Sequence, residues 1–460
     1  MTGDALWWLV MVLAVVCTVL AVMLLRKPRL GRPDVPDSPQ GVPAASAAPA
    51  LPGDDPWFTH WGGGWAAEWT ETTERLTPGT KTVASAGGVR PSLHRPPIAL
   101  YAGRGRATET SGSVLTTTLL WGGDTRFDAE LAMHRHARLV AGVQHRGAER
   151  VLDAGDRFVT PTAVLLWSDA GLGPSSRSLH RWARDHVIRD GHRPRALVFN
   201  NWETMFFDLD PAKVAAVVDG AADTGAELFL LDDGWFGGHH PRDDDGQGLG
   251  DWTVDERKFP DGLAPVVEHV VGTGMRFGLW IEPEMVNPRS ECYEQHPDWV
   301  ISEPGRERRE ERNQLVLDVL RPEVRDFIAG VVDDALALHP AISYLKWDAN
   351  RDLFEVGSPA LPADRQTHLA IDRVRATEEI MAEVARRHPE VGRARLVVEG
   401  EMANDRMTFK IESAAPPAGL AEAVAATLRD VTKLRGDVLL CAPGSLPNDG
   451  KVISDQRSLA

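Results

Sequence analysis

The stretch LFLLDDGWFGG (Leu228–Gly238) decides the fold, because a strand-like apolar run ends there on two carboxylates, Asp232 and Asp233. The stretch YLKWDANRD (Tyr344–Asp352) repeats the pattern and ends its apolar run on Asp348, again beside a tryptophan. Carboxylates at the carboxyl ends of buried parallel strands form the active sites of α/β barrels. Each aspartate taken alone could instead cap the helix that follows its strand. Two such strands in one chain favour a functional site.

The region after Pro194 alternates strand-like and helix-like segments. We expect strands over 195–202, 227–232, 276–281 and 342–347, and helices over 211–224, 263–273, 322–337 and 366–387. Such strand–helix pairs imply right-handed parallel crossovers, and therefore a barrel or an open α/β sheet. The notable polar residues follow the carboxyl ends of these strands, which is the catalytic face of a barrel: Glu203, Asp232, Asp233, Glu282, Glu284 and Asp348.

The region from Trp57 to about Ala170 has the pattern of strands rather than helices. Short runs such as Ser113–Trp121 and Phe158–Trp167 alternate β-branched and apolar residues between turns that contain Gly or Pro. We expect antiparallel sheet here, with Ser178–Val187 as the first helix.

The composition is that of a globular protein that can bury a sizeable core, with 43% hydrophobic and 25% charged residues among 460. A net charge of −16 argues against nucleic acid as a partner. The three cysteines are far apart and odd in number, which excludes a disulfide framework and a CxxC metal knuckle. His239–His240 and Asp243–Asp245 fit neither an HExxH motif nor a calcium loop, so a solvated loop is the preferred interpretation. We expect neither a metal nor a cofactor.

The amino terminus carries a twenty-residue run without charge, Leu6–Leu25, which as a helix spans roughly 30 Å. Four basic residues follow the run within seven positions, and Asp4 is the only charge before it. The positive-inside rule therefore predicts a single-pass membrane helix with the amino terminus outside and the bulk of the chain in the cytoplasm. A secretory signal is the alternative, but it requires positive charge before the apolar run and a cleavage site after it.

The chain from about Thr59 to Pro389 strongly resembles the family 36 glycoside hydrolases, whose main members are α-galactosidases. The matching motifs, in chain order, are EWTETTERLTPGTK (Glu68–Lys81), NNWE (Asn200–Glu203), LDDGWFG (Leu231–Gly237), LGDWTVDERKFPDGL (Leu249–Leu263), FGLWIEPEMVNP (Phe277–Pro288), RNQLVLDVLRPEVRD (Arg312–Asp326) and YLKWDANR (Tyr344–Arg351). Their order, spacing and number make the resemblance highly specific.

This resemblance implies a retaining α-galactosidase, built on a (β/α)₈ barrel of TIM type behind a β-sandwich. It implies that Asp348 is the nucleophile and that Asp232 and Asp233 bind the 4- and 6-hydroxyls of galactose. It further implies residues around the sugar, namely Trp280, Arg312, Lys346 and Asn350.

The chemistry of these residues agrees with such roles. Nearby positive charge from Lys346 and Arg312 would keep Asp348 ionised. A retaining enzyme also needs a second carboxyl, about 5 Å from the nucleophile, to protonate the leaving oxygen. Three tryptophans offer stacking area for a sugar ring, although each could equally be core: Trp202, Trp235 and Trp280.

The resemblance then stops, because the Cys-Ser-Gly-Gly-Gly motif and the Trp-x-Ser-Asp motif that carries the family's general acid do not occur. The chain after Val391 reads instead as strand, strand, helix and strand. Its end, GSLPNDGKVISDQRS (Gly444–Ser458), resembles the small carboxyl-terminal domain of phenylacetate–coenzyme A ligases. In that likeness Lys451 would be the lysine that assists adenylation, idle here without a nucleotide-binding body.

The expected organisation is a partial sandwich, a barrel truncated to about four strands and a small α+β unit. The expected boundaries are 1–5 for an amino-terminal tail, 6–25 for the membrane helix, 26–56 for a flexible tether, 57–190 for the sandwich, 191–390 for the barrel and 391–460 for the ligase-like segment. Three functions remain open: an α-galactosidase impaired by the missing acid, a non-catalytic galactoside-binding protein, and a mosaic without function. The expected partners are an α-galactoside oligosaccharide and, through the amino-terminal helix, a membrane.

Overall fold

The computed structural model describes residues 45–47, 50–64, 66–188, 191–303, 305–355, 357–388, 394–399, 406–412, 421–422, 436–442, 445 and 453–455. The chain divides into two compact units, Met1–Val42 and Pro43–Ala460, and all described residues belong to the second. The predicted membrane helix Leu6–Leu25 and the ligase-like Lys451 therefore lie outside the described residues. In the described part of the chain, no helix has both the length and the apolar character needed to cross a bilayer.

The first region is a β-sandwich of two antiparallel five-stranded sheets. One sheet has the order β1-β9-β8-β5, with β2 also paired to β9, and the other has the order β10-β7-β6-β3-β4. The strands of the first sheet are β1 (Ala45–Ala47), β2 (Ala50–Pro52), β5 (Gly79–Ala84), β8 (Thr125–Leu131) and β9 (His136–Val143). Those of the second are β3 (Trp57–Gly62), β4 (Thr70–Arg75), β6 (Ile98–Ala102), β7 (Val114–Leu120) and β10 (Thr162–Ser168).

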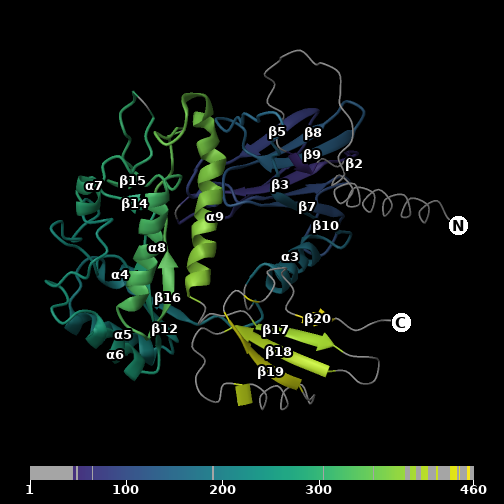
Figure 1. Ribbon diagram of the computed structural model, residues 1–460. Helices are drawn as coiled ribbons and strands as arrows, with labels where there is room; N and C mark the ends of the chain where they lie inside the picture. Colours follow the sequence, from purple (N-terminus) through teal and green to yellow (C-terminus); the bar gives the residue numbers. More distant parts are fainter. Residues whose placement is uncertain are drawn as a thin grey trace. The chain divides into compact units, whose positions relative to one another are not determined.

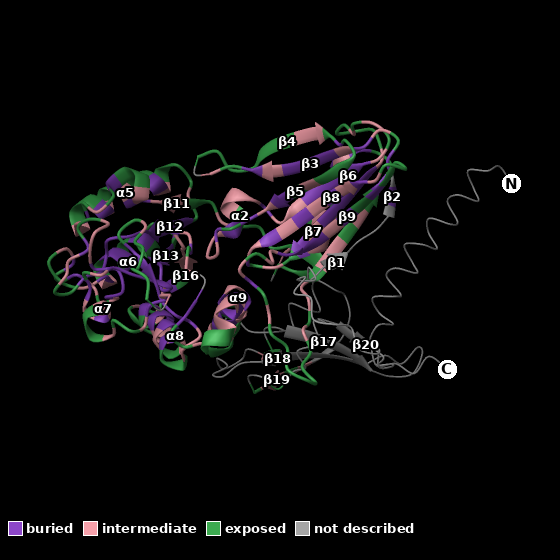
Figure 2. Ribbon diagram, turned by 90° about the horizontal axis from the view of Figure 1, so that it is seen from above, coloured by how far each residue is buried: buried purple, intermediate pink, exposed green. Residues whose placement is uncertain are grey.

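Alternation of side chains builds the core of this sandwich. Along β8 every second residue is buried, and Figure 2 shows the same alternation as coloured bands on neighbouring strands. Because successive side chains on a strand point to opposite faces, the buried set from both sheets meets in one layer. That layer contains Phe58, Tyr101, Leu115, Phe127 and Leu139.

Two of the predicted boundaries in this region were wrong. The tether predicted over 26–56 contains β1 and β2, which pair with β9 at Ala45↔Gly142 and Ala50↔Arg138. These edge strands are three residues long and rich in Ala and Pro, so they lack the β-branched pattern on which strand prediction depends. The first helix is the single turn α2 (Pro91–His94), which was not predicted. The predicted helix corresponds to α3, which covers Leu172–His186 and so begins before Ser178.

The second region is a parallel sheet of order β11-β12-β13-β16 with helices packed on it. Its elements are β11 (Val198–Asn200), α4 (Trp202–Met205), α5 (Pro211–Asp223), β12 (Leu228–Leu231), α6 (Ala264–Gly272), β13 (Arg276–Ile281), α8 (Pro322–Ala337), β16 (Ile342–Trp347), the 3₁₀ helix η1 (Ala363–His368) and α9 (Leu369–Arg387). All three strand pairs are parallel, as right-handed crossovers require. The coarse prediction of a sandwich followed by a parallel α/β sheet is therefore confirmed.

The helices pack on a sheet whose central strand β12 is apolar and buried at all four positions. Phe229 and Leu231 of β12, and Phe277 of β13, join helix residues such as Val218 and Val267 in one fully buried cluster. Figure 1 shows α5, α6 and α8 gathered around β12 and β16. Leu228 and Leu230, on the other face of β12, are buried as well, so polar residues are left to the carboxyl ends of the strands.

Short elements after the strands shape the loops beside these carboxyl ends. They are the antiparallel pair β14 (Met285–Val286) and β15 (Leu315–Val316), and the helix α7 (Glu291–Gln295). The carboxyl-terminal strands form a separate sheet of order β19-β18-β17-β20. These strands are β17 (Ala394–Glu399), β18 (Arg406–Glu412), β19 (Gly436–Cys441) and β20 (Ile453–Asp455).

The sandwich contacts the loop that follows β16. Arg90 Nε donates to Asp352 Oδ1 at 2.8 Å, and the N–H of Leu353 donates to the carbonyl of Gly87 at 3.0 Å. Gly88 has φ +62°, and a β-carbon there would lie 2.6 Å from that of Leu353. Only glycine fits this close approach without strain. The sandwich thus supports the loop that begins at Asp348.

Candidate active site

Asp348 lies directly after β16, at the carboxyl end of the parallel sheet. Its backbone N–H donates to the carbonyl of Ile281 at 2.8 Å, which extends the pairing of β16 with β13. Trp280 Nε1 donates to Asp348 Oδ2 at 2.8 Å, and the N–H of Ala349 donates to Oδ1 at 2.9 Å. Both carboxylate oxygens are therefore held in a defined orientation.

Lys346 joins Asp348 to the neighbouring strands. Its Nζ lies 3.5 Å from Asp348 Oδ2 and donates to Asp232 Oδ2 at 2.9 Å. Asn200 Nδ2, from the end of β11, donates to the same Asp232 oxygen at 2.7 Å. The N–H of Asp232 in turn donates to Asn201 Oδ1 at 2.7 Å. Parallel register thus brings together residues that lie more than a hundred positions apart in the sequence.

The electrostatics of this group favour an ionised Asp348. Burial raises the pKa of its carboxyl, but the Trp280 hydrogen bond and the Lys346 charge outweigh burial, and the pKa lies below the ordinary value. Burial lowers the pKa of Lys346, but its bond to Asp232 and the charge of Asp348 outweigh this, and the pKa lies above the ordinary value. A charged carboxylate beside a charged ammonium is the state a carboxylate nucleophile requires.

Asp233 is bound differently from Asp232. Arg242 Nε donates to Asp233 Oδ1 at 2.9 Å and Arg242 Nη2 donates to Oδ2 at 2.7 Å, a two-point ion pair that is almost fully buried. Burial raises the pKa of Asp233 in spite of the arginine. Arg242 was not predicted as a site residue, because in the sequence it is a lone arginine between a histidine pair and a run of acids.

The two glutamates after β13 are engaged with neighbouring loops. Glu282 is 1% exposed, and its Oε1 accepts the N–H of Asn350 while Oε2 accepts Gln314 Nε2 at 3.2 Å. Burial and then the charge of Asp348 raise the pKa of Glu282 to about 8. Glu284 accepts Arg373 Nη1 at 3.0 Å and is also buried. Glu282 therefore positions the backbone at Asn350, two residues beyond Asp348.

The tryptophans divide between core and surface. Trp235 is fully buried and donates to the Trp280 carbonyl at 3.0 Å, so it belongs to the core. Trp280 is 1% exposed and stacks on Phe236 with ring centroids 6.1 Å apart, so its ring packs in the core while Nε1 reaches Asp348. Trp202 is half-buried and meets Phe206 edge-on at 5.2 Å.

Arg312, the remaining predicted residue, lies in the turn before β15 and pairs with Asp245, with Nη2 to Oδ1 at 3.5 Å. Among the described residues, no group of three or more His, Cys, Asp or Glu side chains is arranged to hold a metal ion.

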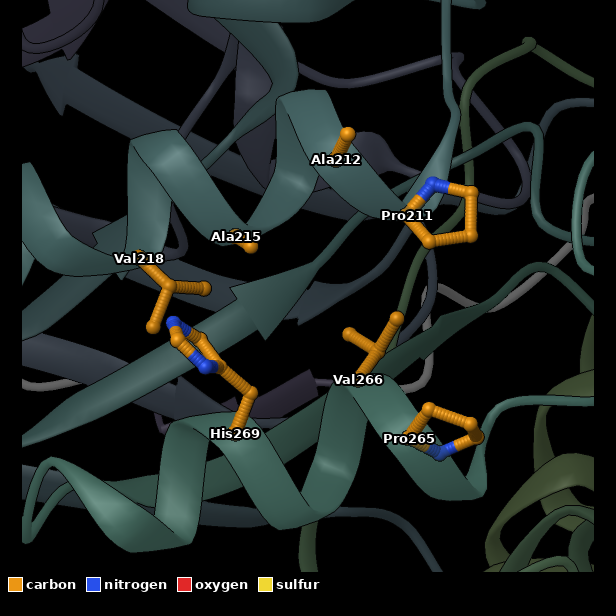
Figure 3. A pocket seen from close by; sticks show the side chains of 7 residues that line it. All are labelled: Pro211, Ala212, Ala215, Val218, Pro265, Val266 and His269. Atoms are coloured by element: carbon orange, nitrogen blue, oxygen red, sulfur yellow. The ribbon is translucent and has the colours of Figure 1, made fainter.

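A pocket of about 300 Å³ lies between α5 and α6 (Figure 3). Its lining is apolar apart from His269, which pairs with Asp219 at 2.8 Å, so it carries none of the predicted chemistry.

A β-sandwich precedes a parallel α/β sheet here, and carboxylates, a lysine and an indole N–H meet at the strand ends. This arrangement fits the class of barrel-type glycoside hydrolases. Comparison with known families agrees. Residues 157–400 match the melibiase family, and residues 42–153 match the glycosyl hydrolase family 36 N-terminal domain. The chain belongs to the melibiase family.

Individual relatives give the same result. The α-galactosidase AgaA of Geobacillus stearothermophilus is 39% identical over 335 residues, which are 72% of this chain and 45% of that protein. α-Galactosidase 1 of Pediococcus pentosaceus is 37% identical over 68% of this chain and 42% of its own length. The crystal structure of AgaA superimposes with a TM-score of 0.71 at 36% identity, over 74% of this chain and 47% of that one. The chain thus spans about half the length of the curated relatives it matches. The family matches end at residue 400, and the likeness of Gly444–Ser458 to a ligase stays a prediction.

Proposed function

We propose that the chain carries the galactose-binding half of a retaining α-galactosidase site that acts on terminal α-linked galactose in oligosaccharides. The observation that carries the proposal is the position of Lys346, which bridges Asp232 and Asp348 from different strands. Variants of the related α-galactosidase AgaA have been crystallised with raffinose and with stachyose, both α-galactosides, which supports this substrate class.

Each residue has a role in this proposal. Asp348 attacks the anomeric carbon, while Lys346 and Trp280 hold it ionised and oriented. Asp232 and Asp233 accept hydrogen bonds from the 4- and 6-hydroxyls of galactose. A site built to pair with a hydroxyl rejects an epimer that misplaces it, because a buried polar group would be left unpaired. Arg312, Asn350 and Trp202 line the sugar in the same scheme.

Protonation of the leaving oxygen is the step of the reaction for which this proposal names no general acid. Among the described residues, the carboxyls beside Asp348 are already engaged: Asp232 with Lys346, Glu282 with Asn350 and Gln314, and Glu284 with Arg373. Loss of a positioned general acid costs about 10²–10⁴ in rate. The 460-residue chain should therefore be impaired on substrates whose leaving group needs a proton.

A comparison of two substrates tests this proposal. The purified chain should hydrolyse 4-nitrophenyl α-galactoside, whose acidic phenol leaves without protonation, far faster than melibiose. The Asp348→Asn variant should lose both activities. Turnover of melibiose at an ordinary enzymatic rate, about 1–10³ per second, would refute the impairment, and the absence of any Asp348-dependent hydrolysis would refute the activity.

A non-catalytic galactoside-binding protein is the second candidate. The burial of Glu282 and Glu284 favours it, since these side chains are 1% and 4% exposed and neither carboxyl is open to a bound sugar. Calorimetry with D-galactose separates the candidates: binding without hydrolysis of the aryl galactoside supports the second.

The amino-terminal run Leu6–Leu25 supports a further part of the proposal, a membrane anchor that leaves the hydrolase-like region in the cytoplasm. Membranes washed with alkaline carbonate should retain the protein. Recovery of a shortened chain in the soluble or secreted fraction would contradict the anchor.

A further inference from the structure

Arg242 is fully buried and uses its whole guanidinium group. Besides the two-point pair with Asp233, its Nη1 donates to the carbonyls of Asp244 and Gln247 at 3.1 and 3.0 Å and to Asn287 Oδ1 at 3.1 Å. A buried guanidinium group is tolerated only where its charge and donors are matched. Its position is therefore determined jointly by Asp233 and by the loop that follows it.

Asp245, in that loop, stands between two arginines. Its Oδ1 atom is buried and accepts no hydrogen bond. That atom lies 3.6 Å from Arg242 Nη2 and 3.5 Å from Arg312 Nη2. The guanidinium groups of Arg242 and Arg312, at nearly equal distances, balance the negative charge of this oxygen without a hydrogen bond. A substitution at Asp245 therefore changes the surroundings of both arginines.

The turn that carries Arg312 is strained. Arg312 and Asn313 have φ values of +54° and +57°, a region that residues other than glycine seldom adopt. Asn287 Nδ2 donates to the Asn313 carbonyl at 2.7 Å, while Asn287 Oδ1 accepts Arg242 Nη1. One asparagine thus ties the strained turn to the buried arginine. Such strain persists where surrounding contacts determine the conformation, and it is frequent at ligand sites.

We propose that Asp245 is a positioning residue, the middle of a chain of alternating charges that runs from Asp233 through Arg242 and Asp245 to Arg312. Asp245 holds the Arg312 guanidinium group in a fixed orientation toward the sugar, and Arg242 holds Asp233. Asp233 and Arg312, the first and last of these four charged side chains, then contact galactose. Because Arg242 and Asp245 hold both of them, the four side chains together determine specificity for the sugar. This last step rests on the proposed function; the positioning of Arg312 does not.

Arginine-selective labelling of the protein without ligand tests the positioning. Arg312 is 43% exposed and so open to phenylglyoxal, and its labelling rate is read by peptide mass spectrometry. Asp245→Asn should raise that rate about two- to fivefold, the range expected for loss of a partly exposed ion pair. Asp244→Asn is the matched control, because it removes a neighbouring charge whose side chain serves only the N–H of Gly246 among the described contacts. Equal labelling of Arg312 in all three proteins would overturn the proposal.

Calorimetry with D-galactose tests the consequence for specificity. Asp245→Asn should weaken binding about fivefold or more, and Asp244→Asn should not. In an Arg312→Ala background Asp245→Asn should cost less than in the wild type, because only its effect through Arg242 remains. Faster labelling with unchanged affinity would keep the positioning and overturn the role in specificity. A wild-type chain that binds no galactose would instead refute the proposed function, while the labelling result still decides the positioning. Circular dichroism of each variant checks the fold, and Asp245→Glu, which keeps the charge, should restore slow labelling.

Discussion

Replacing Lys346 with methionine removes the positive charge that lies between Asp232 and Asp348. Lys346 Nζ lies 2.9 Å from Asp232 and 3.5 Å from Asp348. At an effective dielectric constant of about 20, unit charges at the longer distance of 3.5 Å attract by roughly 5 kcal/mol. The lysine side chain is 33% exposed, so screening by water and salt leaves about 1–3 kcal/mol, roughly a 5- to 150-fold effect on an equilibrium.

The expected result is a rise in the pKa of Asp348, because the lysine is one of the groups that hold it down. The assay is covalent labelling with 5-fluoro-galactosyl fluoride across the acid range, with the modified peptide mapped to Asp348. The acid limb of the rate profile should move to higher pH in Lys346→Met. Lys213→Met is the control, since Lys213 also pairs with an aspartate, at 2.6 Å, but on an exposed face of α5.

Stability should follow the same linkage. The pKa of Asp348 is depressed in the folded state, so its contribution to stability is present above the unfolded pKa and is lost as pH falls through the folded pKa. The loss of unfolding free energy in Lys346→Met, measured with urea, should be largest at neutral pH and shrink as the pH falls. An unchanged acid limb, with the labelled peptide still at Asp348, would refute this account of the site.

Three further predictions concern residues around the site. Arg242→Lys breaks the buried two-point pair and should lower the free energy of unfolding by about 3–5 kcal/mol, as measured in urea at neutral pH; a loss within error of zero would contradict the pairing. Burial raises the pKa of Glu282 to about 8 in the folded protein. The contribution of Glu282 to stability is therefore fully present below the unfolded pKa and is lost as the pH rises toward 8. Glu282→Gln should remove that downward slope in unfolding free energy, and an identical slope in both proteins would show that another group causes it. Gly88→Ala places a β-carbon 2.6 Å from a neighbouring β-carbon at φ +62° and should cost about 1–3 kcal/mol, whereas Gly64→Ala, with open space around it, should be close to neutral in thermal unfolding.

The sequence alone predicted the elements whose signal is local. The strands Arg276–Ile281 and Ile342–Trp347 and the helix Pro322–Ala337 have the predicted bounds, because apolar periodicity within one segment determines each of them. Asp232 and Asp348 were also predicted to lie together, because each follows the carboxyl end of a strand. In the structure both pair with Lys346.

Contacts between distant segments were decided only by the tertiary structure. Nothing local to Asp233 indicates that it turns to Arg242 rather than to Lys346, and nothing near Ala45 indicates pairing with Gly142. Both depend on the register of strands and on loops that meet only after folding. The sequence therefore determined which chemical groups stand at the strand ends. Tertiary packing decided which of these groups form ion pairs with one another, because an ion pair depends on distances of a few ångströms that sequence spacing does not encode.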